Sequence, residues 1–423
     1  MYRGSVAIIA VCSAAILSCS RPAPTAAAPA GHADGASPSA LADGPEWPNF
    51  RGPSNNGFSP EKGINKDWAK KAPQLCWKQS MHDGGYSGPA VAGGVVYILD
   101  HVGQEDVVRA FSIQNGEEKW HYNYADTASA NYGFPRATPT VDGDRVYTMS
   151  RLGKLNCLSI ADGKPVWTVD IVEQFHGKRP GWDLAGSPLI DGNQVVVLAG
   201  GPNAAVVALN KLTGTAVWAG GGSETPGYAT PFITTIDGTR QYVVEYAGGI
   251  CGINPKSGAI LWTYSWQTPM GVNAATPVVL GNSLFVSSGY GFGCSLFEVT
   301  GGTAQKKWGN REMQAHFSSP LVNDGFIYGT GDPGQLMCID PKTGKALWKQ
   351  AGFEKGGIIG VDGVIIGFNG SNGDLIMADF SPTGYHELGR FTPLGGQSWT
   401  APIVAEGRLI VRNKETLACF DVK

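Results

Sequence analysis

The cysteines and histidines of this chain are the side chains best suited to redox, nucleophilic or metal chemistry. The sequence holds eight cysteines and seven histidines. They form neither a Cys-x-x-Cys nor a His-Glu-x-x-His pattern, and no two cysteines are adjacent. The Gly-x-Ser-x-Gly and Walker phosphate-binding patterns are absent as well. The sequence therefore predicts no protein metal site and no catalytic residue.

Candidate binding residues gather in the segments that join a tryptophan to the next proline. Segments 120–139 and 167–188 are the longest of these, and long loops on a rigid scaffold commonly carry function. Their aromatic, polar and charged residues, with those of the equivalent loops, are Tyr86, Tyr132, Phe134, Arg136, Trp182, Asp183, Tyr228, Asn273, His316, Lys355 and Trp399. Aromatic residues mixed with Arg suit recognition of a protein or an extended polymer. Alternatively, the aromatic side chains only fill a central channel.

The first residues read as an export signal. Arg3 precedes the apolar run 6–17, which is shorter than a membrane span. Ile16-Leu17-Ser18-Cys19 resembles a bacterial lipobox, in which Cys19 would be acylated after cleavage of residues 1–18. We expect an exported outer membrane lipoprotein that faces the periplasm or the cell surface. A soluble secreted or periplasmic protein, cleaved elsewhere, is the alternative.

The next two segments separate this signal from the repeats. Residues 19–46 are rich in Ala and Pro and predict a flexible tether. Residues 47–71 begin with an aromatic patch that we expect to pack on the following domain. The formal net charge is −3 without a basic block, which disfavours a nucleic-acid partner. We expect a monomer that meets the membrane through its lipid anchor only.

From residue 72 onward the sequence repeats itself. Each copy closes on a tryptophan, and the series is Trp77, Trp120, Trp167, Trp218, Trp262, Trp308 and Trp348. These residues recur every 40–51 positions, which is the spacing of a four-stranded propeller blade. Small residues before proline, such as Thr138-Pro139, open the copies, and Asp-Gly pairs such as Asp324-Gly325 predict hairpins between them.

Eight blades result if two degenerate copies are counted. Phe391 takes the place of a closing tryptophan in one of them. Residues 400–422 supply only three strands of the last blade, and residues 72–77 supply its fourth. The predicted fold is an all-β, eight-bladed propeller over residues 72–423, closed by its N-terminal strand. Cys76 and Cys419 fall on neighbouring strands of that blade, where the register decides between a disulfide and two free thiols.

An eleven-residue motif is more specific than this periodicity. It has a small residue first, Gly seventh and Trp eleventh, and occurs at 110–120, 157–167, 208–218, 252–262 and 338–348. We expect each Trp to pack on the neighbouring blade where a small side chain leaves room. The motif resembles the tryptophan-docking motif of the pyrroloquinoline quinone (PQQ) dehydrogenase propellers, which the eight-bladed lipoprotein family BamB shares. The resemblance covers about residues 72–423.

The resemblance implies two functions. Quinoproteins of this fold hold PQQ between a Trp and a disulfide of adjacent cysteines, with Ca²⁺ on Glu and Asn. This chain has no adjacent cysteines and is shorter than those enzymes. We therefore favour the non-catalytic branch, a scaffold that binds an envelope protein and needs no cofactor. The alternative is a PQQ- and calcium-dependent alcohol or sugar dehydrogenase, with Asp183 and Asn273 as site residues; another extracellular activity also stays open.

Overall fold

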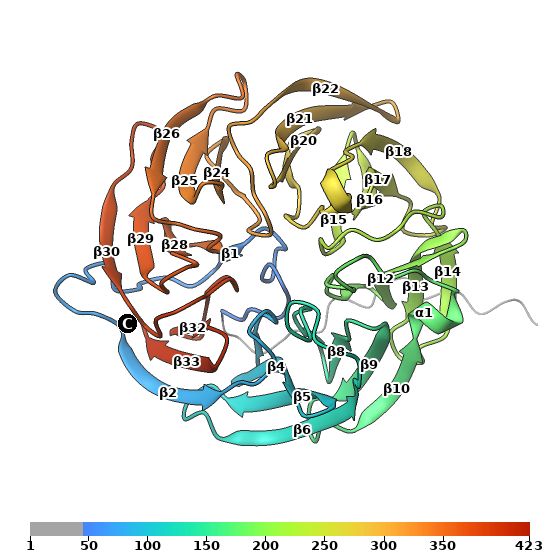
Figure 1. Ribbon diagram of the computed structural model, residues 1–423, viewed down its shortest axis with the longest axis horizontal. Helices are drawn as coiled ribbons and strands as arrows, with labels where there is room; N and C mark the ends of the chain where they lie inside the picture. The colour runs from blue at the N-terminus through green and yellow to red at the C-terminus, as the bar shows by residue number, and fades with distance from the viewer. Residues whose placement is uncertain (1–44) are drawn as a thin grey trace, which may run out of the picture. The chain divides into compact units, whose positions relative to one another are not determined.

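Four-stranded antiparallel sheets surround a central axis in the computed structural model, which describes residues 45–423 (Figure 1). The eight sheets confirm the predicted eight-bladed propeller. In each of blades 1 to 7 the first strand lies nearest the axis and the last lies on the outside. The predicted signal peptide, Cys19 and nearly all of the tether lie outside the described residues.

Blades 1 to 4 follow one another along the chain. Their strands are β3 (Ala90–Ala92), β4 (Val95–Val102), β5 (Glu105–Ser112) and β6 (Glu118–Ala125); β7 (Thr140–Asp142), β8 (Arg145–Met149), β9 (Lys154–Ser159) and β10 (Pro165–Asp170); β11 (Leu189–Asp191), β12 (Gln194–Gly201), β13 (Ala204–Asn210) and β14 (Ala216–Gly220); and β15 (Phe232–Ile236), β16 (Thr239–Tyr246), β17 (Gly249–Ile253) and β18 (Ile260–Ser265).

Blades 5 to 8 complete the ring. Their strands are β19 (Val278–Leu280), β20 (Ser283–Ser288), β21 (Gly293–Thr300) and β22 (Thr303–Asn310); β23 (Leu321–Asn323), β24 (Phe326–Gly331), β25 (Gln335–Ile339) and β26 (Ala346–Ala351); β27 (Ile358–Val361), β28 (Val364–Phe368), β29 (Leu375–Asp379) and β30 (Glu387–Phe391); and β31 (Ile403–Ala405), β32 (Arg408–Arg412), β33 (Thr416–Asp421) and β2 (Gln74–Ser80).

Strand β2 closes the ring as predicted, because it pairs antiparallel with β33 although the two are far apart in sequence. Trp77 lies opposite Cys419, and the register shifts between Leu75 and Trp77, so that Cys76 sits at a bulge. Cys76 is exposed and Cys419 is buried, and both are free thiols. The structure therefore holds both cysteines as thiols on paired strands; burial raises the pKa of Cys419, and the nearby Cys76 adds to that rise.

Helical structure is scarce in the described residues. The sequence did not predict helix α1 (Ile171–Gln174), which begins after β10 with the Asp170 side chain accepting from the Glu173 amide. A 3₁₀ turn covers Pro269–Gly271. Between residues 45 and 423, no helix has both the length and the apolar character needed to cross a membrane.

The hydrophobic core lies between neighbouring blades, because each sheet buries both of its faces. One cluster joins Tyr147 and Leu155 of blade 2 to Val195 and Val207 of blade 3. The predicted Asp-Gly hairpins connect first and second strands, and at Asp324-Gly325 both residues have positive φ, as a type I′ turn requires. Because the strands of each blade run antiparallel, the loops that join them lie on the two flat faces of the ring.

Each tryptophan of the motif contacts the next blade, but through a different residue from the one we expected. A Cβ on Gly163, the seventh residue of the blade 2 motif, would lie 2.5 Å from the Trp120 ring of blade 1. The Trp120 Nε1 donates a 2.8 Å hydrogen bond to the Ile160 carbonyl in the same turn. The small first residue, Ala110, instead lies opposite Trp120 within its own sheet. A glycine of the next blade receives the indole in the same way at Trp77, Trp167, Trp218 and Trp308, but not at Trp262.

The same donation to a carbonyl of the next blade recurs around the ring, at Trp77, Trp167, Trp218, Trp308 and Trp348. Trp262 differs, because its Nε1 donates to Gln241 of its own blade at 2.5 Å. In blade 7, Gly389 and not Phe391 occupies the tryptophan position, since Gly389 lies opposite Met377 just before the register shift. Assigning Phe391 to that position was therefore wrong.

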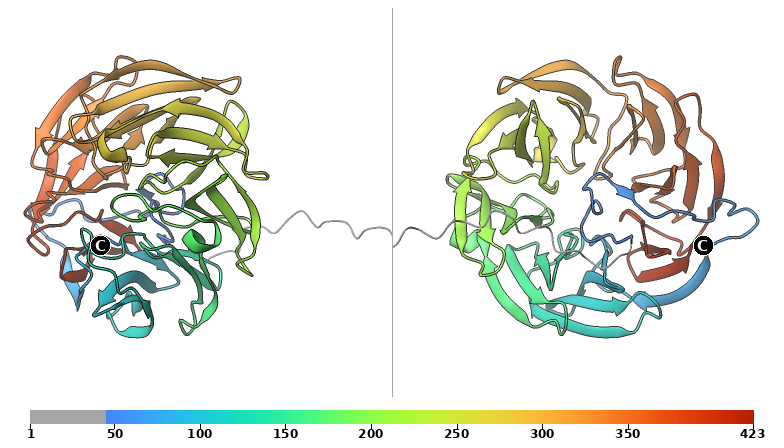
Figure 2. Two further views of the ribbon diagram at one scale, coloured as in Figure 1. Left: turned by 45° about the vertical axis from the view of Figure 1, so that its right-hand side comes forward. Right: turned by 180° about the vertical axis from the view of Figure 1, so that it is seen from behind.

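The N-terminal segment 46–71 crosses the ring on the face shown from behind in Figure 2. Trp47 pairs with Val91 of blade 1, and strand β1 (Phe58–Ser59) adds in parallel to β27 of blade 7. The Ser59 hydroxyl donates to the Val404 carbonyl of blade 8 at 2.6 Å. The segment thus joins blades 7, 8 and 1, which follow one another around the ring.

Candidate binding site at the centre of the ring

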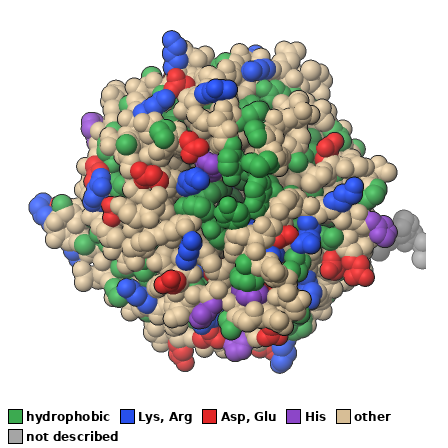
Figure 3. Space-filling view, viewed as in Figure 1, with side chains coloured by type: hydrophobic (Ala, Val, Ile, Leu, Met, Phe, Trp, Pro, Cys, Tyr) green, Lys and Arg blue, Asp and Glu red, His purple; other side chains and the backbone are tan. Residues whose placement is uncertain are grey.

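A cavity lies at the centre of the ring on the face shown in Figure 3, where hydrophobic side chains surround a hollow. Its volume is about 480 Å³, within the range of about 300–1,000 Å³ that is typical of ligand pockets. The N-terminal segment forms the floor, to which Trp47, Phe50, Arg51 and Gly57 contribute. Trp47 is 1% exposed and Arg51 is 7% exposed, so this floor is closed.

Part of the wall comes from small residues that precede the first strand of five of the blades. Gly88, Thr138, Thr230, Ser319 and Ala401 line the cavity and directly precede a proline. Their backbone and hydroxyl groups also join the blades: the Thr276 amide, for example, donates to the Ser319 hydroxyl at 3.0 Å. The landmark that the sequence repeats therefore shapes the channel.

Aromatic side chains form the upper part of the cavity. They are Tyr86, Tyr132, Trp182, Tyr228, Tyr290, Phe317 and Trp399, which we call the aromatic rim. The Trp399 ring lies 5.7 Å from that of Tyr86 and 5.3 Å from that of Phe317, between ring centroids. In another part of the rim, the ring centroids of Trp182 and Tyr228 are 6.2 Å apart. The rim therefore offers ring faces and edges to an occupant.

Among residues 45–423, three cationic side chains line the cavity and no carboxylate does. Arg51 donates to the carbonyls of Asn56 and Pro320 at 2.8 and 2.9 Å, and burial lowers its pKa to about 10, which leaves it charged at neutral pH. Arg136 donates to the carbonyls of Trp182 and Asn131, and burial lowers its pKa. Lys355 lies with its Nζ 5.4 Å from the Trp399 ring centroid. The cavity therefore favours an anion.

His316 also lines the cavity, with its Nε2 at 2.7 Å from the Asp332 carboxylate. Burial lowers the pKa of His316 despite this partner, so the imidazole is neutral at pH 7. Its ring makes an edge contact with Tyr290 at 4.6 Å. His316 thus extends the aromatic surface without adding charge.

Eight of the predicted binding residues meet in this cavity: Tyr86, Tyr132, Arg136, Trp182, Tyr228, His316, Lys355 and Trp399. Phe134 does not line it, because its ring stacks on His101 at 3.5 Å. Asn273 is fully buried, and its amide donates to the carbonyls of Tyr246 and Trp266 at 2.7 and 3.0 Å. Asn273 therefore fixes a loop of blade 4.

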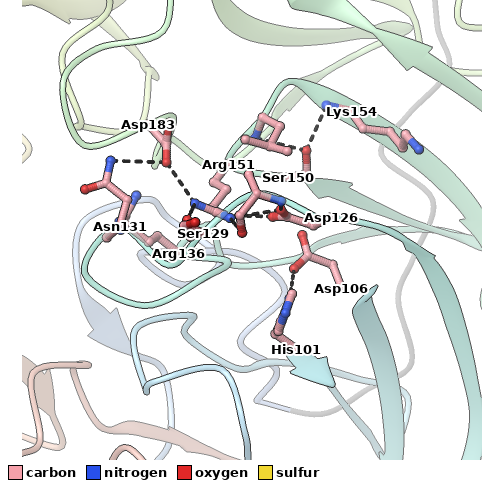
Figure 4. A network of polar contacts seen from close by, with 12 residues as sticks. His101, Asp106, Asp126, Ser129, Asn131, Arg136, Ser150, Arg151, Lys154 and Asp183 are labelled. Atoms are coloured by element: carbon pink, nitrogen blue, oxygen red, sulfur yellow. Dashed lines mark hydrogen bonds and ion pairs between the residues drawn. The ribbon is translucent and has the colours of Figure 1, made fainter. Parts of the chain in front are cut away.

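Asp183 belongs to a buried ionic network beside the cavity (Figure 4). Arg151 is 1% exposed and donates to both oxygens of Asp126, at 2.7 and 2.9 Å, and to Asp183 at 3.0 Å. The Asn131 amide donates to Asp183 at 3.3 Å. Because 126–136 is the loop that carries Tyr132 and Arg136, this network positions one side of the aromatic rim.

The same network contains His101, Asp106 and Asp126, whose ligand atoms lie within 4.8 Å of one another. The histidine Nδ1 is 3.0 Å from the Asp106 carboxylate and its Nε2 is 3.1 Å from the Gly103 carbonyl. The two oxygens of Asp126 already accept from Arg151. Each of the three residues therefore has a partner within the protein. Their positions in the sequence match no metal-binding motif.

Sequence reasoning missed two rim residues and the floor. Tyr290 lies in Gly289-Tyr-Gly-Phe-Gly293, which reads as a turn, and Phe317 follows His316 just before a small residue and a proline. The repeat could have predicted Phe317, because Tyr86, Tyr228 and Trp399 also stand three residues before the proline that opens a blade. Nothing in the sequence places Arg51 under the channel.

The comparisons with known proteins agree with the fold and the repeats. A family model described as "Outer membrane protein assembly factor BamB" matches residues 129–350. The chain is 25% identical over 334 residues to the outer membrane protein assembly factor BamB of Yersinia pestis, covering 74% of this chain and 81% of that protein. To that of Escherichia coli strain K12 it is 25% identical over 339 residues, with the same coverage.

Solved structures share the fold. The crystal structure of BamB from Moraxella catarrhalis has a TM-score of 0.60 at 17% identity and covers 82% of this chain and 97% of that one. A europium-containing methanol dehydrogenase has a TM-score of 0.65 at 14% identity, covering 89% and 98%. At these identities the likeness concerns the fold alone.

Proposed function

This chain belongs to the family of the outer membrane protein assembly factor BamB, whose model matches more than half of it, and on that premise we propose a function. The protein is a non-catalytic propeller of the cell envelope that helps to assemble outer membrane proteins by binding an envelope protein. The observation that carries this proposal is the family match over residues 129–350, together with curated relatives of the same description along 74% of the chain.

The donor set of the cavity argues against the dehydrogenase alternative. Calcium takes oxygen ligands, mainly carboxylates, but no Asp or Glu lines the cavity. Asp183 is held by Arg151 and Arg179, and the Asn273 Oδ1, the atom that calcium would need, already accepts from the Ser288 hydroxyl at 3.2 Å. The sequence also lacks adjacent cysteines. The residues present therefore do not fit PQQ with calcium, and no catalytic step is assigned.

Export and lipid anchoring complete the proposal. Cleavage after residue 18 would leave Cys19 as the lipid-modified N-terminus, and residues 19–46 would tether the propeller to the outer membrane. Residues 47–71 would then act as part of the folded domain, since Trp47 and Trp68 are buried against the blades.

The test is a deletion of the coding sequence in the native bacterium, followed by measurement of folded outer membrane proteins in its envelope. We expect their amount to fall, and the wild-type chain to restore it. Affinity capture from detergent-solubilised envelopes should recover an outer membrane assembly protein, and Cys19→Ala should abolish incorporation of a labelled fatty acid. Unchanged folded levels in the deletion strain would refute the proposal, as would dye reduction by the purified chain with PQQ, Ca²⁺ and an alcohol.

A further inference from the structure

We propose that the central cavity binds the C-terminal end of a partner polypeptide, with its terminal carboxylate near Lys355 and one or two aromatic side chains against the aromatic rim. The inference rests on the proposed function in one respect, namely that the partner is a protein. It adds the part of that partner that is recognised and the residues that recognise it.

The closed floor selects a chain end. Residues 47–57 lie under the cavity, and Arg51 fixes them to blade 6 through the Pro320 carbonyl at 2.9 Å. The Trp47 amide and the Val91 carbonyl are 3.0 Å apart, which fixes the segment to blade 1 as well. A polypeptide that enters from the open face therefore cannot pass through the ring. Only a terminus or a side chain can reach the bottom of the cavity.

The charges select a carboxylate. Elsewhere in the described chain buried arginines have carboxylate partners, as Arg151 has Asp126 and Arg412 has Asp83. The cavity cations differ, because Arg51 and Arg136 donate to carbonyls and Lys355 has no ion pair within residues 45–423. A half-buried cation without a counterion favours an incoming anion, since desolvation strengthens the attraction.

The rim selects aromatic side chains. Tyr132 is 68% exposed and Tyr290 is 48% exposed, and both stand at the mouth of the cavity. Trp399 is flanked by Tyr86 and Phe317 and lies beneath Lys355. Well-oriented pairs of aromatic rings attract each other beyond the area that they bury, so the rim favours aromatic side chains. The volume of about 480 Å³ admits such an end but no folded domain.

The experiment measures fluorescence anisotropy of a short dye-labelled peptide that ends in Tyr-Phe, with the purified exported protein. The free-acid peptide should bind, and its C-terminally amidated twin should bind at least about tenfold more weakly, the loss expected for a charge-assisted hydrogen bond. Affinity for the free acid should fall as salt is raised. Equal binding of both peptides, or no binding of the free acid, would overturn the inference.

Matched variants locate the site. Lys355→Gln should weaken binding of the free-acid peptide several-fold without lowering the melting temperature, whereas Lys119→Gln, on the exposed outer strand β6, should have no effect. Unchanged binding of the peptide by Lys355→Gln would overturn the inference. If 3-phenylpropionate competes as well as the peptide, the ligand is a small aromatic acid and the assignment to a polypeptide end is wrong.

These readouts separate the inference from the proposed function. If partner capture from envelopes succeeds and the peptide does not bind, the inference fails and the proposed function stands. If the peptide binds and the deletion strain assembles its outer membrane proteins normally, the inference stands and the proposed function fails.

Discussion

The Trp68 side chain lies against Gly389, where a Cβ added to the glycine would be 2.8 Å from the Cβ of Trp68. Gly389 holds the position in blade 7 that a docking tryptophan holds in other blades. Trp68 is 3% exposed and packs edge to face on Phe391, with ring centroids 5.1 Å apart. The N-terminal segment thus supplies, from outside the blade, the aromatic side chain that blade 7 lacks.

This contact predicts that Trp68→Ala lowers the free energy of unfolding by about 3–5 kcal/mol, as expected when a buried tryptophan is truncated. Trp68→Phe should recover most of that loss, because the indole Nε1 of Trp68 has no hydrogen-bond partner. Urea denaturation followed by circular dichroism measures both. A Trp68→Ala protein as stable as wild type would show that the segment does not support blade 7.

The docking series predicts that Trp262→Ala also costs about 3–5 kcal/mol, because Trp262 is 4% exposed and packs on Phe297 of the next blade. Trp399→Ala should cost much less, since Trp399 lies outside the series and faces the cavity. Thermal unfolding of the two variants decides. Equal losses would contradict the distinction between docking and rim tryptophans.

Gly116 carries a sharper test of the docking contact. It has φ +73°, and a Cβ there would lie 2.8 Å from the Trp77 ring. Gly103 has φ +68° and an added Cβ would meet nothing within 4 Å, so it is the matched control. Gly103→Ala reports the backbone strain alone, roughly 1 kcal/mol. Gly116→Ala should lower the melting temperature clearly more, and equal shifts of the two would rule out the steric role of Gly116.

The His101–Asp106 pair predicts a pH-dependent stability. Burial raises the pKa of Asp106 to about 6, with Asp126 adding to the rise and His101 opposing it. Because the folded pKa exceeds the unfolded value, this carboxyl favours the fold below about pH 4, and the contribution is lost as the pH rises through about 6. The full effect is roughly 3 kcal/mol.

Asp106→Asn keeps the group uncharged and able to donate to His101 Nδ1, whose ring already directs Nε2 at the Gly103 carbonyl. The variant should therefore gain stability over wild type at pH 8 and show little difference at pH 4. Denaturation at both pH values measures this gain. An Asp106→Asn protein that loses stability at pH 8 would mean that the ionised carboxylate supports the fold.

The parts of this protein that depend on local spacing could be predicted from the sequence. The recurring Trp, Gly and small-residue-proline positions determined the blade count and the closure by residues 72–77. They could do so because every blade makes the same contacts with its neighbour. They also placed most of the rim, since equivalent loops converge at one end of the axis. Phe134 and Asn273 do not line the cavity, because a loop position does not show whether its side chain turns inward.

Only the tertiary structure decided what the repeat does not contain. Arg51 closes the channel and Trp68 completes blade 7, and both come from a segment without a counterpart in the repeat. The Arg151 network joins residues far apart in the chain, and the lack of carboxylates in the cavity is a property of one surface. Sequence determines contacts that recur at a fixed spacing, whereas contacts made once, across the ring, depend on where the chain's path brings each side chain.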